Sequence, residues 1–274
     1  MTTNKPGILL LHGYPLDNRM WSEQLGFLDS RFLCFRPNFP GFGGPVAAEP
    51  NVHLVDSNAP IHVSLEYSEW TSLSGLSDWL ANAIDRSHDT LRMVADKWIV
   101  CGLSMGGYVA LEFWKRHRHR VAGLVLTNTK ASVDDDQAIA NRLAVIEQAN
   151  LFGSDSVTLP MIPKLLSQAN IETNPKLVAR VEAMMRSVSS TTIGRSQQAM
   201  IARNSFMDDL SVIDVPTLVL AGARDVITPA LEMESMAAKI PQSYFKVIEN
   251  AGHLSPMENP AAWNADFLSF IAKF

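Results

Sequence analysis

The chain has 274 residues, of which 47% are hydrophobic and 19% charged, and this balance excludes a disordered chain and indicates a folded globular protein. Its formal net charge of −5 argues against nucleic acid or an anionic membrane surface as a partner. The length suffices for one large α/β domain, with or without an inserted subdomain.

Two features favour a reducing, cytoplasmic location. Cys34 and Cys101 lie in or beside apolar runs that are typical of buried strands, so we expect buried free thiols. Residues 1–6 contain no apolar leader segment, and no stretch approaches the length of a membrane span. We therefore expect a cytoplasmic protein without a membrane partner.

Six short apolar runs are typical of buried parallel strands. Helical periodicity occurs between them, over residues 21–28, 72–86, 229–240, and from 105 and 260 onward. This alternation predicts an α/β fold with a mostly parallel sheet and helices on both faces. The predicted strands begin at Ile8, Phe32, Trp98, Val121, Thr217 and Tyr244.

Local signals refine this pattern. Thr228 and Asn259 each precede a proline, which is the N-cap and first-position pattern of a helix start. Residues 45–66 contain three prolines and little periodicity, so we expect a long irregular insertion. The basic run 115–120 lies between a helix and a strand, and we expect it to cover a solvated turn.

A helical block interrupts the alternation. Residues 131–206 show no strand pattern, whereas helical spacing occurs over 139–148, 159–169, 176–188 and 193–203. We therefore predict an α/β core made of residues 1–130 and 207–274, with residues 131–206 inserted as an all-helical lid.

The segment Gly102-Leu103-Ser104-Met105-Gly106-Gly107 connects a predicted strand to a predicted helix. A sharp strand-to-helix turn brings two backbones together, so glycines are needed where side chains would collide. The serine is expected in a strained conformation with an exposed hydroxyl, next to the N–H groups of a helix N-terminus. On this motif alone, a glycine-rich turn with a capping serine is the alternative.

Further polar residues follow other strands. A serine hydroxyl needs a base to become nucleophilic, and His253 follows the last predicted strand. Asp225 follows the strand before it, and the carboxyl ends of parallel strands meet at one edge of a sheet. Asp208 and Asp209 are rival acids, whereas Asp214 precedes its strand and so lies at the wrong edge.

Four segments together resemble the landmarks of α/β-hydrolases, and the layout is similar to the carboxylesterase and 3-oxoadipate enol-lactonase-like branch. The resemblance implies Ser104 as nucleophile, His253 as general base and acid, and Asp225 as the group that orients the imidazole. It also implies an oxyanion hole formed by the backbone N–H groups of Tyr14 and Met105. The segments are Leu11-His12-Gly13-Tyr14-Pro15, residues 102–107, Gly222-Ala223-Arg224-Asp225 and Gly252-His253.

No cofactor or metal is expected. The string Gly41-Phe42-Gly43-Gly44 lacks a following helix start, which disfavours phosphate binding. His117 and His119 have no third ligand placed by the sequence. We expect His12 to brace the Gly13 turn. His53 and His62 lie in the 45–66 segment, either solvated or near the pocket.

A serine at the turn suits attack on an acyl carbon, whereas haloalkane dehalogenases and epoxide hydrolases use an aspartate there. The predicted function is therefore hydrolysis of small, largely apolar esters or lactones through an acyl-serine, with no nucleic-acid partner. Perhydrolysis or haloperoxidation, carbon–carbon bond hydrolysis and aminopeptidase action are alternatives on the same triad. A ligand-binding receptor on a hydrolase scaffold is an alternative of another class.

The lid region is rich in residues suited to an adaptable acyl pocket, although packing within the lid is the expected role for most of them. They are Met161, Met184, Met185, Met200, Phe206 and Met207.

Overall fold

The computed structural model describes residues 5–28, 32–44, 51–53, 61–62, 70–86 and 95–274, with the backbone alone at 51–53, 61–62 and 158–159. Its strands form one sheet in the order β4-β3-β2-β1-β5-β6-β7-β8. From β2 to β8, neighbouring strands pair in parallel, as the alternating sequence pattern predicts. The strands are β1 (Gly7–Leu11), β2 (Cys34–Phe35), β3 (Asn51–His53), β4 (Ile61–His62), β5 (Trp98–Leu103), β6 (Val121–Thr127), β7 (Thr217–Gly222) and β8 (Ser243–Ile248).

Strands β3 and β4 correct the expectation of an irregular 45–66 segment. β3 pairs antiparallel with both β2 and β4, so the sheet extends beyond the six predicted strands. β3 has three residues and β4 has two, which is too short for an alternating apolar pattern to be recognised in the sequence. These strands depend on the pairing of β3 with β2 and not on a local sequence signal. The remainder of 45–66, and the side chains of His53 and His62, lie outside what the structure describes.

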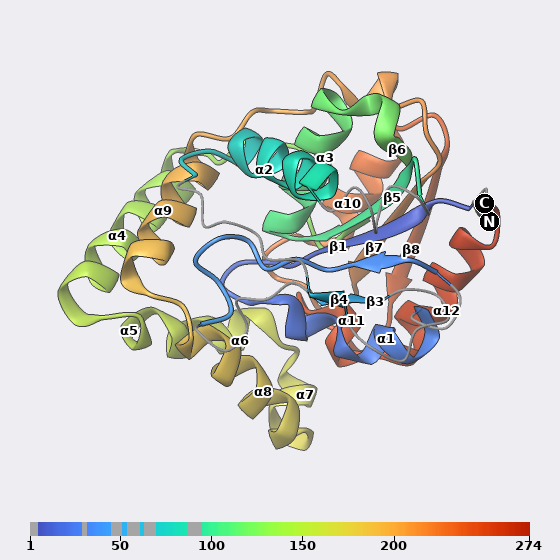
Figure 1. Ribbon diagram of the computed structural model, residues 1–274. Helices are drawn as coiled ribbons and strands as arrows, with labels where there is room; N and C mark the ends of the chain where they lie inside the picture. The colour runs from blue at the N-terminus through green and yellow to red at the C-terminus, as the bar shows by residue number, and fades with distance from the viewer. Residues whose placement is uncertain (1–4, 29–31, 45–50, 54–60, 63–69, 87–94) are drawn as a thin grey trace.

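Helices cover both faces of the sheet, which confirms the prediction (Figure 1). β1 shows why both are needed: Leu9 and Leu11 belong to one apolar core, and Ile8 and Leu10 to the other. The first core is covered by α2 (Leu73–Arg86), α3 (Met105–Arg116) and α10 (Ala230–Ala237), and the second by α1 (Ser22–Leu28), α11 (Ser255–Glu258) and α12 (Pro260–Ile271).

Every residue from 131 to 206 has a described backbone, and that stretch contains helices and no strand. The helices lie beyond one end of the sheet in Figure 1. They are α4 (Asp136–Phe152), α5 (Asp155–Thr158), α6 (Ile162–Leu165), α7 (Gln168–Thr173), α8 (Pro175–Arg186) and α9 (Ser190–Ile201).

The single helix predicted over 159–169 is wrong. A 3₁₀ turn at Leu159–Met161 leads into α6, and Leu166, the residue after this helix, has an extended backbone. Ser167 then caps α7 by accepting a hydrogen bond from the N–H of Asn170. The apolar spacing is continuous across this break, so the cap at Ser167 decides where the helix stops.

The predicted cap at Asn259 is confirmed, because its side chain accepts from the N–H of Ala262 at the start of α12. The predicted cap at Thr228 is wrong. α10 begins after Pro229 without a side-chain cap, and the Thr228 hydroxyl donates to Asp225 Oδ2 at 2.6 Å. Competition from this buried carboxylate redirects the hydroxyl.

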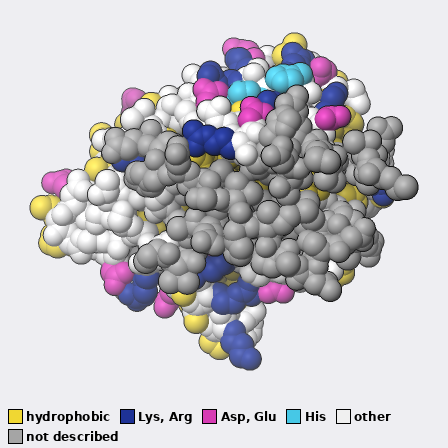
Figure 2. All heavy atoms as spheres, in the orientation of Figure 1, with side chains coloured by type: hydrophobic (Ala, Val, Ile, Leu, Met, Phe, Trp, Pro, Cys, Tyr) yellow, Lys and Arg dark blue, Asp and Glu magenta, His cyan; other side chains and the backbone are white. Residues whose placement is uncertain are grey.

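The basic run 115–120 lies among acidic partners. Figure 2 shows one face of the molecule, and positive and negative side chains lie together near the top of this view. Arg116 pairs with Asp78, and Arg120 pairs with Asp85 of the same helix α2. His117 Nε2 also lies 3.1 Å from Asp78 Oδ1. These contacts pin α3 and the following turn to α2, in agreement with a surface role for the run.

Candidate active site

Ser104 stands between β5 and α3 with φ 53° and ψ −115°, a backbone conformation that non-glycine residues rarely adopt. Its N–H donates to the Thr127 carbonyl, and its own carbonyl accepts from the Thr129 hydroxyl at 2.8 Å. Its hydroxyl is half-buried and forms no hydrogen bond with any described residue. The backbone is therefore fixed while the hydroxyl stays available.

The glycines around Ser104 are required by close backbone approach, as the sequence predicts. A Cβ on Gly102 would overlap the backbone of Gly106, and a Cβ on Gly106 would overlap the carbonyls of Leu11 and His12. The strand-to-helix turn at residues 102–107, here called the elbow, therefore lies directly against the loop that follows β1. That loop contains Tyr14, the second predicted oxyanion-hole residue.

The loop after β1 is held by His12, which braces the turn as predicted. Its Nε2 accepts from the N–H of Phe39 at 2.9 Å, and its Nδ1 lies 3.1 Å from the Gly13 carbonyl. Burial lowers the pKa of His12 to about 4, so the ring is neutral at pH 7 and Nδ1–H donates. Because that carbonyl shares a peptide plane with the Tyr14 N–H, His12 also orients this N–H.

Tyr14 and Met105 are buried residues, and the N–H group of neither donates a hydrogen bond to any described residue. Buried backbone donors are nearly always paired in folded proteins. Two unpaired donors on adjoining loops beside Ser104 are therefore suited to an oxygen acceptor supplied by a ligand.

Asp225 and His253 lie past the ends of β7 and β8 and are almost fully buried. His253 Nδ1 is 2.8 Å from Asp225 Oδ2. Burial alone would raise the pKa of Asp225. The charge and hydrogen bond of His253, with hydrogen bonds from Thr228 and Asn128, outweigh burial and lower the pKa to about 2. The carboxylate therefore stays ionised and can fix the imidazole.

The rival acids have other partners. Asp209 Oδ2 accepts from Lys115 Nζ at 2.8 Å, and Asp214 pairs with Arg118. Asp208 is exposed. Among the described acids, Asp225 alone is hydrogen-bonded to His253.

Sequence reasoning missed the residues that support this pair. Asn128 donates to Asp225 Oδ2 at 2.8 Å, and its own oxygen accepts from the Ser255 hydroxyl. Glu258 accepts from the N–H groups of Gly252 and Leu254, which flank His253, and from the N–H of Ser167. Asn128 directly follows β6, so the strand-end rule that found Asp225 could also have found it.

The residues suggested for an acyl pocket are mainly packing residues. Met184, Met185, Met200 and Phe206 are buried in the two cores. Met161 and Met207 are partly buried against them. These six side chains therefore hold the helical block together and to the sheet.

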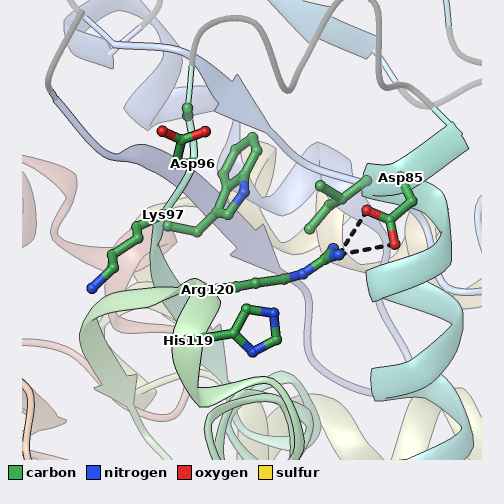
Figure 3. A pocket seen from close by; sticks show the side chains of 8 residues that line it. Asp85, Asp96, Lys97, His119 and Arg120 are labelled. Atoms are coloured by element: carbon green, nitrogen blue, oxygen red, sulfur yellow. Dashed lines mark hydrogen bonds and ion pairs between the residues drawn. The ribbon is translucent and has the colours of Figure 1, made fainter.

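A separate cavity of about 280 Å³ lies at the opposite edge of the sheet, where β5 and β6 begin (Figure 3). Arg120 in its wall is neutralised by two hydrogen bonds to Asp85, at 2.7 and 2.9 Å. Asp96, Lys97 and His119 also line it. None of the predicted site residues borders this cavity.

Within the described ranges, no group of three or more His, Cys, Asp or Glu side chains is arranged to hold a metal ion. Cys34 and Cys101 are buried and form no disulfide, as expected. Of the helices in the described parts, none combines the length and the apolar character needed to cross a bilayer.

Comparison with known proteins shows which family the sequence belongs to. The model of the alpha/beta hydrolase family matches residues 8–266. The chain is 24% identical to pimeloyl-[acyl-carrier protein] methyl ester esterase of Aromatoleum aromaticum, with 94% of each chain covered. It is 23% identical to 3-oxoadipate enol-lactonase 1 of Acinetobacter baylyi, over 98% of this chain and 89% of that protein.

A solved structure of an esterase has a similar fold. The thermophilic esterase from Thermogutta terrifontis, with malate bound, matches at a TM-score of 0.83 and 33% identity, over 99% of this chain and 91% of that one. The fold and the elbow thus define an α/β-hydrolase, and the chain belongs to the alpha/beta hydrolase family. Its homologues and structural neighbours include esterases and lactonases, which are hydrolases acting on ester bonds.

Proposed function

We propose that this protein hydrolyses carboxylic esters or lactones of small molecules through an acyl-serine intermediate. The observation that carries the proposal is the buried His253–Asp225 hydrogen bond of 2.8 Å, at the same sheet edge as the strained Ser104. Ser104 is the nucleophile, His253 the general base and acid, and Asp225 the orienting carboxylate. Relatives whose names include esterase and enol-lactonase support the ester or lactone bond as the target.

In the first half of the reaction Ser104 Oγ attacks the acyl carbon, and its proton passes to His253 Nε2. This nitrogen is free for the proton because Nδ1–H donates to Asp225. The negative charge that develops on the acyl oxygen is stabilised by the N–H groups of Tyr14 and Met105. His253 then returns the proton to the departing alkoxide, and the acyl-serine remains.

In the second half a water molecule attacks the acyl carbon while His253 takes its proton. The carbon–Ser104 bond breaks and the proton returns to Ser104 Oγ, which releases the acid. For a lactone the first half opens the ring, and the freed alcohol stays attached to the acyl chain, so that one molecule bearing both groups leaves at this step. No Ser104–His253 hydrogen bond is present among the described residues. Hydrogen bonds of this kind often tighten only when substrate binds, and we propose the same here.

We further propose that residues 131–206 act as a lid on the core formed by 1–130 and 207–274. The His253 and Leu254 N–H groups donate to the Leu165 carbonyl, and Glu258 binds the N–H of Ser167. The helical block is thus fastened beside the general base, where it restricts access to Ser104.

The test is turnover of short-chain 4-nitrophenyl esters and a lactone panel. We expect Ser104→Ala to lower kcat about 10⁴-fold or more with folding intact, and Asp225→Asn to lower it by about 10³–10⁴-fold through the wrong imidazole tautomer. Asp209→Asn is the matched control, since this rival acid pairs with Lys115 at the surface, and its rate should stay near wild type.

Equal rates for wild type and Ser104→Ala would remove Ser104 from the mechanism. Activity lost in Asp209→Asn and kept in Asp225→Asn would reassign the acid. No turnover of any ester or lactone would favour a ligand-binding receptor. Turnover that requires peroxide and a halide would favour the perhydrolase alternative.

A further inference from the structure

A buried ion cluster lies where the helical block meets the core. Arg203 donates from Nη1 and Nη2 to the two oxygens of Asp134, at 2.7 and 2.8 Å, and both side chains are at most 3% exposed. The other Arg203 hydrogen atoms bond the carbonyls of Ser132 and Met200. All the N–H groups of the Arg203 guanidinium therefore donate to protein oxygen atoms, and none is left for a ligand.

Arg142 of α4, unlike Arg203, does not use all of its nitrogen atoms in hydrogen bonds to described residues. Its Nε donates to Asp134 Oδ2 at 2.6 Å, and its Nη1 contacts Gln197 Oε1 and Met200 Sδ. Its Nη2 donates to no described residue, although the guanidinium is held rigidly and is one-fifth exposed. A rigidly held guanidinium nitrogen that no described residue uses can donate charge-assisted hydrogen bonds to a carboxylate.

The charges in the cluster do not balance. Burial would raise the pKa of Asp134, but hydrogen bonds from Arg203 and Arg142 hold it far below its usual range. Lys130 Nζ lies 3.6 Å from the same carboxylate. The Asp134 carboxylate thus lies within ion-pair distance of three cations, which is more positive charge than this one carboxylate neutralises.

The cluster adjoins the candidate active site. The Arg203 guanidinium lies 4.7 Å from the centre of the Tyr108 ring, and the Tyr108 N–H donates to the Ser104 carbonyl. The Thr129 hydroxyl also donates to the Ser104 carbonyl, and Asp134 comes five residues after Thr129 in the chain. The ion cluster is therefore connected to the elbow from both α3 and the β6 loop.

A second polar group in this region is the buried Tyr14 hydroxyl, which forms no hydrogen bond of normal geometry with any described group. Burial raises the pKa of Tyr14 to about 12, while nearby Gln197 and the charge of Arg142 act in the opposite direction. Gln197 therefore connects the two groups, because it accepts from Arg142 Nη1 and lies beside the Tyr14 hydroxyl. The N–H of Tyr14 belongs to the proposed oxyanion hole.

We propose that Arg142 Nη2, assisted by Gln197 and the Tyr14 hydroxyl, binds a carboxylate carried by the acyl part of the substrate. The substrates are then monoesters of short dicarboxylic acids, or lactones bearing a free carboxylate. This inference rests on the proposed function, because it places the anion relative to an acyl group on Ser104. It changes the expected substrate from a largely apolar ester to an anionic one.

The experiment compares two esters that differ only in charge: 4-nitrophenyl hydrogen glutarate and methyl 4-nitrophenyl glutarate. We expect wild type to favour the anionic ester in kcat/KM. Arg142→Gln should lower kcat/KM for that ester about ten- to a hundredfold, mainly by raising KM, and change the neutral ester by less than about threefold. Arg142→Lys should restore part of the preference, since it restores the charge without the planar fork.

Arg186→Gln is the matched control, because Arg186 is an exposed arginine of the same helical block that pairs with Asp155. Its ester preference should equal that of wild type. Tyr14→Phe removes only the buried hydroxyl and should reduce the preference severalfold. A wild type without preference for the anion overturns the inference, as does an Arg142→Gln variant that loses both esters equally. If Arg142→Gln does not fold, wild type and Tyr14→Phe decide.

Direct binding separates this inference from the proposed function. Titration calorimetry with glutarate should show binding to wild type that is lost in Arg142→Gln, and dimethyl glutarate should bind both equally. Glutarate binding without turnover of either ester would keep the anion site and reject the esterase. Turnover of the neutral ester without glutarate binding or anion preference would keep the esterase and reject the anion site.

Discussion

At the scale of single residues, Asp225 and His12 are both buried, but the charged form of Asp225 and the neutral form of His12 are favoured because their partners differ. Asp225 faces His253, Thr228 and Asn128, which stabilise its charged form, and its pKa falls to about 2. His12 faces a backbone carbonyl, a backbone N–H and the rings of Phe39 and Phe42, so its neutral form is favoured and its pKa falls to about 4.

The His12 shift predicts a pH-dependent stability. An unfolded histidine titrates near 6.5 and the folded one near 4, so the unfolded state binds more protons between these values. This contribution is fully present above about pH 6.5 and is lost as pH falls toward 4. From pH 7.5 to pH 5 it amounts to about 2 kcal/mol of the free energy of unfolding.

The measurement is urea unfolding of wild type and His12→Asn at pH 7.5 and pH 5. We expect the variant to be less stable at pH 7.5 and its deficit to shrink by about 2 kcal/mol at pH 5. His119→Asn, at an exposed histidine, is the control and should show the same deficit at both values. A His12→Asn deficit independent of pH would contradict a buried neutral ring.

The proposed catalytic residues could be selected from the sequence because each lies in the segment that follows a buried strand, and an apolar run reveals where such a strand ends. The supporting residues were harder to select. Glu258 binds the amides on both sides of His253, yet in the sequence it is one acidic residue near a helix start. The cluster of Asp134, Arg142 and Arg203 joins residues up to 69 positions apart, which no local pattern reveals.

At the scale of elements, the distance between α3 and its neighbours is set by glycines. A Cβ on Gly107 would lie 2.5–2.6 Å from the Thr129 side chain, whose hydroxyl binds the Ser104 carbonyl. The nearest atom to a Cβ on Gly194, in the interior of α9, would be 3.7 Å away. The two helical glycines therefore differ in what surrounds them and not in their helix propensity.

This difference predicts opposite effects of one substitution. Gly107→Ala should destabilise by about 1–3 kcal/mol through overpacking and lower ester turnover by displacing Thr129. Gly194→Ala should stabilise by up to about 1 kcal/mol, because alanine is the better helix former and the space is open. Urea unfolding and ester turnover check both, and a stabilised, fully active Gly107→Ala would contradict the packing described at the elbow.

The elements that the sequence misplaced are those with weak local signals. The break between α6 and α7 depends on a cap at Ser167, and β3 and β4 on pairing with β2. The long elements had strong signals: the strands on both sides of the elbow and helices α2, α3 and α8 lie close to their predicted positions.

At the scale of the whole molecule, sheet order brings distant segments together. β5, β6, β7 and β8 are consecutive neighbours, so the residues that follow them lie along one edge of the sheet. Ser104, Asn128, Asp225 and His253 each come from one of these four ends. The α/β fold class and this edge were predictable from the alternating pattern, whereas the contacts of the helical block with the His253 loop were not.

The most direct test of the account is labelling with a fluorophosphonate, followed by peptide mass spectrometry to locate the modified residue. The account predicts phosphonylation of Ser104 alone, greatly slowed in His253→Ala and absent in Ser104→Ala. Labelling of another residue, or an unlabelled Ser104 in a preparation that still turns over esters, would contradict it.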